Sequence, residues 1–195
     1  MKKIFVIILL INGFNTFSQK CRFTTEENIE DVNNRIIETN DILIDGLAPN
    51  NLSISFLQIG DRYFVCLDYL FLDNSGVTIN GVGLPKSQFP KINRINKDGL
   101  MIFTLMNGAK VTVNANEELE STRRNLTKAT TEYKINDLKY SIHSDDLILL
   151  QSEVIEKVEI QFFKSNEIES QLLKIQVSEM RDTKIKNYIT CLLNY

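Results

Sequence analysis

The chain has 195 residues, of which 43% are hydrophobic and 24% are charged, a balance typical of a folded globular protein and not of a disordered one. Its formal net charge of −3 disfavours nucleic acid and anionic lipid as the main partner, because both require clustered Lys and Arg side chains.

The start of the chain has the pattern of a secretory signal peptide. Two lysines precede an apolar run over residues 4–11 that is too short to span a bilayer, and small residues occupy the −3 and −1 positions before Gln19. We therefore expect residues 1–18 to be a cleaved signal peptide. Residues 19–195 should form a single domain in the periplasm or outside the cell, without a membrane span.

The three cysteines are Cys21, Cys66 and Cys191. Outside the cytoplasm a disulfide could join Cys21 to Cys191, which lie near the two ends of the mature chain. Cys66 lies in an apolar stretch, where a thiol usually packs as a small hydrophobic group. A lipid-modified Cys21 is disfavoured, because no small residue directly precedes it.

The first predicted strands run over residues 35–45, 52–57 and 62–72. Both faces of the third strand are apolar, which favours a central position in the sheet. Asp68 interrupts this strand and is therefore our candidate acid, since burial would raise its pKa. The alternative is that Asp68 lies at an edge or is satisfied by a turn.

The next segment, residues 73–98, is rich in Gly and Pro and should be a loop with a short strand at 77–79. After it, residues 100–113 predict a β-hairpin. Its Asn107-Gly108 pair favours a two-residue type I′ turn, in which both residues adopt positive φ. This register sets Thr104 opposite Val111 and Ile102 opposite Val113.

The second half of the chain alternates polar segments with regular elements. Residues 114–130 should be a polar connection, followed by a strand over 131–135 and a short helix capped by Ser144. This helix should place Leu147, Ile148 and Leu150 against the core. A second hairpin is expected from strands near 154–163 and 173–177. Ser178 should cap a final helix, whose apolar stripe is Ile185, Ile189 and Leu192.

No pattern in the chain identifies an active site. His143 is the only histidine, so an ordinary zinc site or a Ser-His-Asp triad would depend on it, and it more simply lies on the surface or at a helix cap. The Gly81-Val82-Gly83 triplet lacks the third glycine of a phosphate loop. We therefore assign no catalytic, cofactor-binding or metal-binding residue.

Three segments together resemble a group of secreted Bacteroidota proteins of unknown function. They are the hairpin GLMIFTLMNGAKVTV (99–113), the stretch YSIHSDDLILLQSEVIEKVEIQF (140–162) and the closing helix IKNYITCLLNY (185–195). The resemblance implies a mostly antiparallel β domain that ends in a helix, and it supports an extended conformation for residues 35–45. It implies no activity and no functional residues.

Together these patterns predict a mainly β (α+β) protein: an antiparallel β-sandwich or strongly bent sheet of roughly seven or eight strands with a C-terminal helix. A pleckstrin-homology-like barrel is the alternative.

We expect a non-catalytic binding or interaction protein that works outside the cytoplasm on an unknown protein or glycan. Its working surface would be the irregular segments 73–98 and 114–130, because loops usually carry binding sites. The alternatives are a small periplasmic hydrolase that uses carboxylates, with Asp68 as its best candidate, and a periplasmic inhibitor or immunity protein.

Overall fold

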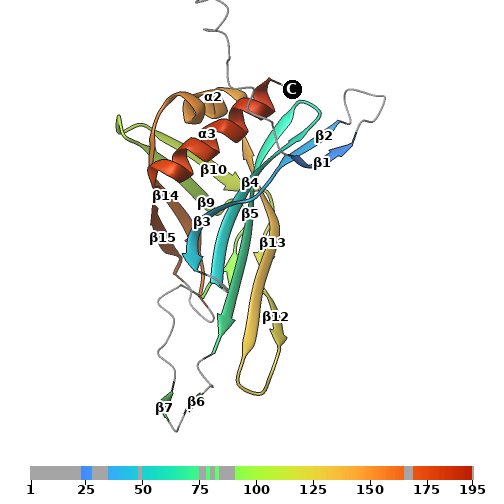
Figure 1. Cartoon of the computed structure of the whole chain (residues 1–195), viewed down its shortest axis with the longest axis vertical. Helices are drawn as coiled ribbons and strands as arrows, with labels where there is room; N and C mark the ends of the chain where they lie inside the picture. The colour runs from blue at the N-terminus through green and yellow to red at the C-terminus, as the bar shows by residue number, and fades with distance from the viewer. Residues whose placement is uncertain are drawn as a thin grey trace, which may run out of the picture.

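Antiparallel strands form one large, strongly curled sheet in the computed structural model (Figure 1). The structure describes residues 23–27, 35–47, 50–74, 78–79, 82–83, 91–164 and 169–194. The strands of the large sheet are β1 (Phe23–Glu27), β2 (Ile36–Thr39), β3 (Ile42–Leu47), β4 (Asn50–Ile59), β5 (Arg62–Asp73), β9 (Leu100–Leu105), β10 (Lys110–Ala115), β12 (Thr122–Asn125), β13 (Thr131–Ile142), β14 (Ile155–Phe162) and β15 (Gln171–Gln176).

The strand order across this sheet is β1-β2-β4-β5-β13-β10-β9-β14-β15. β3 pairs with β4 beyond the end of β2, and β12 pairs with β13 beyond the end of β10. Two short pairs lie outside it: β6 (Thr78–Ile79) with β7 (Val82–Gly83), and β8 (Arg94–Ile95) with β11 (Leu119–Glu120). The helices are α2 (Ser144–Ser152) and α3 (Glu179–Leu193). The predicted class is confirmed: a mainly β, strongly bent antiparallel sheet with a C-terminal helix.

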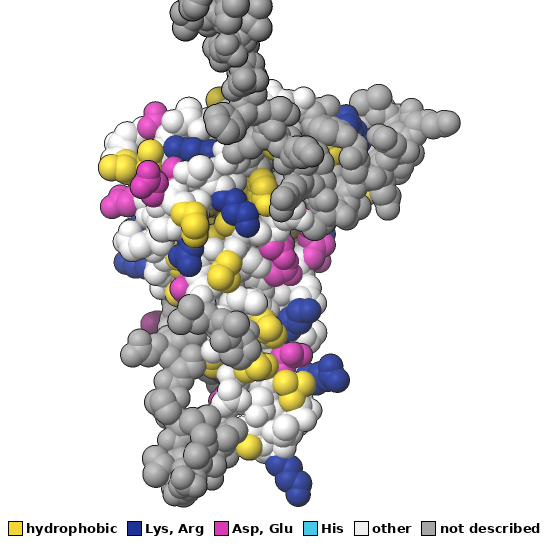
Figure 2. Space-filling model, viewed as in Figure 1, with side chains coloured by type: hydrophobic (Ala, Val, Ile, Leu, Met, Phe, Trp, Pro, Cys, Tyr) yellow, Lys and Arg dark blue, Asp and Glu magenta, His cyan; other side chains and the backbone are white. Residues whose placement is uncertain are grey.

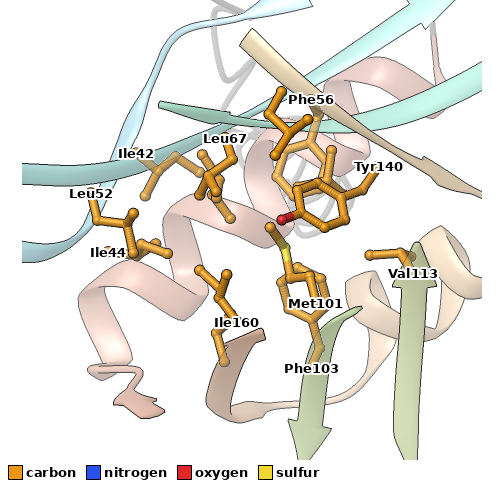
Figure 3. Close-up of a cluster of buried hydrophobic side chains, with 14 of the residues drawn as sticks. Ile42, Ile44, Leu52, Phe56, Leu67, Met101, Phe103, Val113, Tyr140 and Ile160 are labelled. Atoms are coloured by element: carbon orange, nitrogen blue, oxygen red, sulfur yellow. The ribbon is translucent and has the colours of Figure 1, made fainter. Parts of the chain in front are cut away.

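The curl brings strands from both ends of the sheet around one hydrophobic core. Phe56 from β4, Phe103 from β9 and Ile160 from β14 are all fully buried and point into the same space (Figure 3). The helix α3 lies across β2, β3 and β4 and against α2, so that it covers this inner face. Its apolar stripe is the one expected: Ile185, Ile189 and Leu192 are buried. None of the helices among the described residues is both long enough and apolar enough to span a bilayer.

The helix α3 begins where the sequence predicts, and a buried carboxylate fixes it to the sheet. The hydroxyl of Ser178 accepts a hydrogen bond from the Arg181 N–H, as an N-cap does. An acidic residue in the first turn of a helix is usually exposed, but Asp182 is only 5% exposed. Its Oδ1 accepts the Ile155 N–H at 2.9 Å, and its Oδ2 lies 3.1 Å from the Lys186 ammonium. The start of β14 is thereby joined to α3.

The turn of the β9–β10 hairpin differs from the predicted type I′ turn. Gly108 has a positive φ of 85°, but Asn107 does not. The Gly108 N–H donates to the Leu105 carbonyl, and the Leu105 N–H donates to the Ala109 carbonyl. The loop therefore contains three residues rather than two, with glycine in the left-handed position.

This longer turn shifts the register of the hairpin by one residue. The predicted pairs, Thr104 with Val111 and Ile102 with Val113, are wrong. In the structure Val111 pairs with Phe103, and Val113 pairs with Met101. All four of the paired residues are buried, at 2% exposure or less. The shift is favoured because it sets the apolar residues of both strands on the core side, whereas the two-residue turn would have placed them on opposite faces.

Other predicted boundaries also move. The expected strand over 35–45 is split into β2 and β3, and where the register slips the Thr39 hydroxyl accepts the Phe56 N–H at 2.9 Å. The residue at the N-cap of α2 is His143, whose side chain makes no cap hydrogen bond, rather than Ser144. Ile148 of α2 is 51% exposed and does not join the core. The expected connection 114–130 contains β11 and β12.

The link between α3 and β14 predicts a specific loss of stability. Replacing Asp182 by Ala leaves the buried Ile155 N–H without an acceptor, so the free energy of unfolding should fall by about 1–3 kcal/mol. Urea denaturation followed by circular dichroism measures this fall. The control Glu179→Ala removes an exposed carboxylate from the same helical turn and should change stability by no more than about 0.5 kcal/mol. Equal losses for the two variants would contradict the assignment.

Candidate functional site

The outer face of the sheet carries a row of polar side chains on its central strands. In β4, Leu52, Ile54 and Phe56 point into the core, so the alternate residues Ser53 and Ser55 point outward. The antiparallel register with β5 sets Asp68 opposite Ser53 and Cys66 opposite Ser55. The candidate acid Asp68 therefore lies on a central strand, as the apolar run around it indicates.

A β-bulge in β13 adds a second carboxylate beside Asp68. The pairing of β13 with β5 slips between Ile135 and Leu138, so that two residues, Asn136 and Asp137, oppose the single residue Asp68. Asp137 has a positive φ of 52°, and its N–H donates to Asp68 Oδ1 at 2.9 Å. The alternative interpretation, that Asp68 lies at an edge or is satisfied by a turn, is wrong: the strand is central, and the bonded N–H belongs to the bulge in the adjacent strand. The carboxylate of Asp68 holds the bulge from the neighbouring strand.

The bulge also brings Asp137 close to a buried thiol and another carboxylate. Ligand atoms of Glu38, Cys66 and Asp137 all lie within 4.8 Å of one another. The Ser55 hydroxyl donates to Glu38 Oε1 at 3.3 Å, and the ammonium of Lys139 donates to Asp137 Oδ2. Strands β2, β4, β5 and β13 each contribute to this cluster.

Cys66 has the character of a structural thiol rather than a nucleophile. It is free and 1% exposed. Burial, with the nearby Asp137 carboxylate, raises the pKa of the thiol, so that it stays protonated at neutral pH. A metal ion would need the thiolate and would have to displace Lys139 from Asp137. The arrangement therefore favours the protonated thiol over a metal centre.

A polar pocket of about 390 Å³ opens next to this cluster. We call it the Asp68 pocket; it is lined by Asp41, Asn51, Ser53, Asp68, Tyr69, Leu70, Lys134 and Asn136. Its carboxylates repel one another and their neighbours. Burial and the charge of Asp68 raise the pKa of Asp41, although Lys184 opposes this shift. Burial and the charge of Asp137 likewise raise the pKa of Glu38.

A second hollow, of about 470 Å³, lies farther along the same strands and contains the only histidine. His143 lines it together with Arg62, Lys139 and Ser141. The Ser141 hydroxyl donates to the Asn116 side-chain carbonyl at 2.7 Å, so this serine is engaged in the structure. His143 thus faces a shallow polar surface, and the described residues around it form no Ser-His-Asp triad.

A third hollow, of about 430 Å³, separates β3 from α3. Leu43 and Met180 line it and are 43% and 78% exposed. On the face of the molecule that carries α3, hydrophobic, acidic and basic side chains are interspersed (Figure 2). This groove therefore lacks the concentration of polar groups found around Asp68.

Several sequence-based predictions fall partly or wholly outside the described residues. Cys21 and the signal peptide over 1–18 lie outside them, as do residues 75–77, 80–81 and 84–90 of the loop 73–98. Cys191 is 7% exposed and disulfide-bonded. The expected surface 114–130 includes β12, whose residues, with Arg123 and Arg124 among them, are all exposed.

Sequence reasoning missed Glu38, Asp41 and Asp137 as site residues. One signal was present for Asp137: the apolar alternation of Tyr133 and Ile135 resumes out of phase at Leu138, which indicates a bulge. The other two had no local signal.

No family model matches the chain, and no curated protein or solved structure matches it either.

The raised pKa of Glu38 predicts a pH-dependent stability. A carboxyl group whose pKa rises on folding favours the folded state while it is protonated, and this contribution is lost as the pH rises through the folded-state pKa. Glu38→Gln should therefore raise the melting temperature by about 1–4 °C at pH 7 and have little effect near pH 4.

Thermal denaturation monitored by circular dichroism at both pH values provides the measurement. The control Glu156→Gln alters an exposed carboxylate on β14 for which we expect no such pH-dependent gain. A Glu38→Gln gain that is the same at pH 4 and pH 7 would rule out this electrostatic explanation.

The cysteines predict a defined labelling pattern. Iodoacetamide should not modify native protein at Cys66, because the thiol is buried and protonated. After denaturation without reductant it should modify one thiol per chain, at Cys66. Peptide mapping under non-reducing conditions should find Cys21 joined to Cys191. Rapid alkylation of the native protein, or three modified thiols after denaturation, would contradict this pattern.

Proposed function

We propose that the protein is a non-catalytic binding module that acts outside the cytoplasm and contacts its partner through the outer face of β2, β4, β5 and β13. The observation that carries this proposal is the group of mutually repelling carboxylates beside the Asp68 pocket. We call this group the acidic band; it consists of Glu38, Asp41, Asp68 and Asp137.

The acidic band is unfavourable in the free protein. Glu38 and Asp41 have raised pKa values, in each case first because they are buried and then because a neighbouring carboxylate repels their charge. Groups that reduce stability in the free protein are commonly retained where binding needs them. A partner with cationic groups would relieve the repulsion, and its approach would be favoured by the field of the band.

Binding is favoured over catalysis by the way the side chains are already engaged. Asp68 Oδ1 accepts the N–H of the bulge, Asp137 bonds to the ammonium of Lys139, and the thiol of Cys66 is held protonated. These contacts position charges, whereas a nucleophile or general base needs a free lone pair directed at a substrate.

Action outside the cytoplasm is supported by two features of different kinds. The sequence begins with the pattern of a signal peptide. In the structure, Cys191 is disulfide-bonded, and disulfides persist mainly in oxidising compartments.

One observation favours a hydrolase as the second candidate. Asp41 and Asp68 line the same pocket, and the charge of Asp68 contributes to the raised pKa of Asp41. A carboxyl group with a raised pKa beside a second carboxylate is an arrangement used in acid–base hydrolysis. If so, Asp41→Asn and Asp68→Asn should each abolish turnover of a substrate found by screening glycosides and esters.

The proposed function predicts selective loss of a partner. Purified mature protein, immobilised at its C-terminus, is used to capture partners from the periplasm and medium of its own host. Wild type is compared with the double variant Glu38→Gln/Asp137→Asn. A partner retained by the wild type should fall at least about fivefold with the double variant, because two charges of the acidic band are removed.

The matched control is Asp145→Asn/Asp146→Asn, which removes two carboxylates from the first turn of α2. It should capture the partner as well as the wild type does. If the control loses the partner, or if the double variant keeps it, the outer face is not the binding surface.

A further inference from the structure

We infer that the Asp68 pocket is a subsite for a guanidinium group, carried by an arginine side chain of the protein's ligand. This inference rests on the proposed function and specifies the chemistry of its binding surface. It is argued from the acceptors in the pocket, from one unpartnered hydroxyl, from the surrounding charge and from the size of the pocket.

The pocket offers many hydrogen-bond acceptors on three strands and one linker. Asp41 and Asp68 supply carboxylate oxygens, and Asn51 and Asn136 supply side-chain carbonyls. Asp68 Oδ1 already accepts the Asp137 N–H, so its Oδ2 remains for a ligand. A guanidinium has five N–H donors and no acceptor, and it pairs with carboxylates in a planar, bidentate manner.

Ser53 supplies an independent indication of a ligand. It is 8% exposed, it lines the pocket, and it lies directly opposite Asp68 in the sheet. Within the described part of the chain its hydroxyl has no hydrogen-bond partner, whereas the hydroxyl of Ser55, two residues along the same strand, donates to Glu38. Because Ser53 lines the pocket, an N–H donor placed there can bond to its hydroxyl, which has free acceptor capacity.

The charges around the pocket favour a cation. Two lysines beside the acidic band are already engaged: Lys139 bonds to Asp137, and Lys184 donates to the backbone carbonyl of Asp41 at 3.1 Å. Lys134 lines the pocket but is exposed, so water screens its charge. The electrostatic potential in the part of the pocket lined by Ser53 and Asp68 is therefore expected to be negative.

Two other ligand classes fit less well. A single metal ion needs oxygen ligands converging at about 2.0–2.6 Å, and a pocket of about 390 Å³ is far larger than such a cage. A sugar ring usually stacks on an exposed aromatic side chain. The aromatic residue lining the pocket, Tyr69, is fully buried, and its hydroxyl accepts the Ile92 N–H in the core.

The test uses a blocked peptide, acetyl-Gly-Gly-Arg-Gly-Gly-amide, titrated into the ¹⁵N-labelled mature protein and followed by NMR. A matched peptide carries citrulline, which has nearly the same shape as arginine but no charge. The arginine peptide should give saturable shifts at the amides of Ser53, Asp68 and Asn136, with a Kd of about 1–10 mM. The citrulline peptide should bind at least about tenfold more weakly.

Two variants separate recognition from folding. Ser53→Ala should weaken the arginine peptide by about threefold or more without lowering the melting temperature, because the hydroxyl has no partner to lose. Asp68→Asn keeps the acceptor for the Asp137 N–H and should weaken the peptide by about tenfold. The control Ser55→Ala changes a serine directed at Glu38 instead and should leave the affinity within about twofold.

A third arm identifies the source of the guanidinium. Agmatine, a small guanidinium compound, is titrated under the same conditions. We expect the peptide to bind at least about threefold more tightly than agmatine, since its backbone adds contacts along the sheet. Agmatine binding as tight as the peptide would overturn the assignment to an arginine side chain. Equal binding of the citrulline peptide, or shifts confined to other residues, would overturn the guanidinium subsite itself.

Failure of this inference and failure of the proposed function give different results. If Ser53→Ala and Asp68→Asn retain the captured partner while Glu38→Gln/Asp137→Asn loses it, the outer face binds the partner but the pocket holds no arginine. If neither set changes capture, the proposed surface is wrong.

Discussion

The β-bulge in β13 is the constraint that keeps both halves of this long central strand packed on the core, and the hydrogen bond from the Asp137 N–H to Asp68 Oδ1 lies at its centre. This bond closes the bulge at which β13 changes phase. Before the bulge Ile135 points into the core, and after it Leu138 and Tyr140 do the same. Without the extra residue, half of this strand would direct its apolar side chains to solvent. A bulge also increases the local twist of a sheet, so this contact contributes to the curl as well.

The curl separates the two faces of the sheet by role. The inner face encloses a core that α3 covers, held by the bond between Asp182 and the start of β14. The outer face of the same central strands does not pack on that core, and it carries serines and carboxylates. Strands that build the core thus also position Glu38, Asp68 and Asp137, whereas Asp41 lies in the short linker between β2 and β3.

The comparison with the sequence shows where local patterns suffice. Alternation predicted β4 and β14, a continuous apolar run predicted β5, and helical spacing predicted the stripe of α3, since each signal lies within one element. The register of the β9–β10 hairpin was missed because an Asn-Gly pair suits both turn types, and only the pairing of Val111 with Phe103 decides between them. Glu38 and Asp137 lie about one hundred residues apart in the sequence, and the order of the strands brings them together. No local sequence pattern predicts that order.

Elsewhere in the same sheet, a buried carboxylate is neutralised by lysines. Glu159 of β14 is 6% exposed, yet Lys157 and Lys174 approach its oxygens at 3.1 and 3.7 Å. The hydrogen bond from Lys157 lowers the pKa of Glu159, whereas burial and Asp137 raise that of Glu38. One sheet thus holds one carboxylate with matched cations and another among like charges. Beside Glu38 lies Ser55, whose hydrogen bond lowers the pKa of that carboxyl but does not offset burial and the charge of Asp137. The two carboxylates therefore differ because strand pairing sets Lys174 opposite Glu159, whereas the bulge in β13 brings Asp137 close to Glu38.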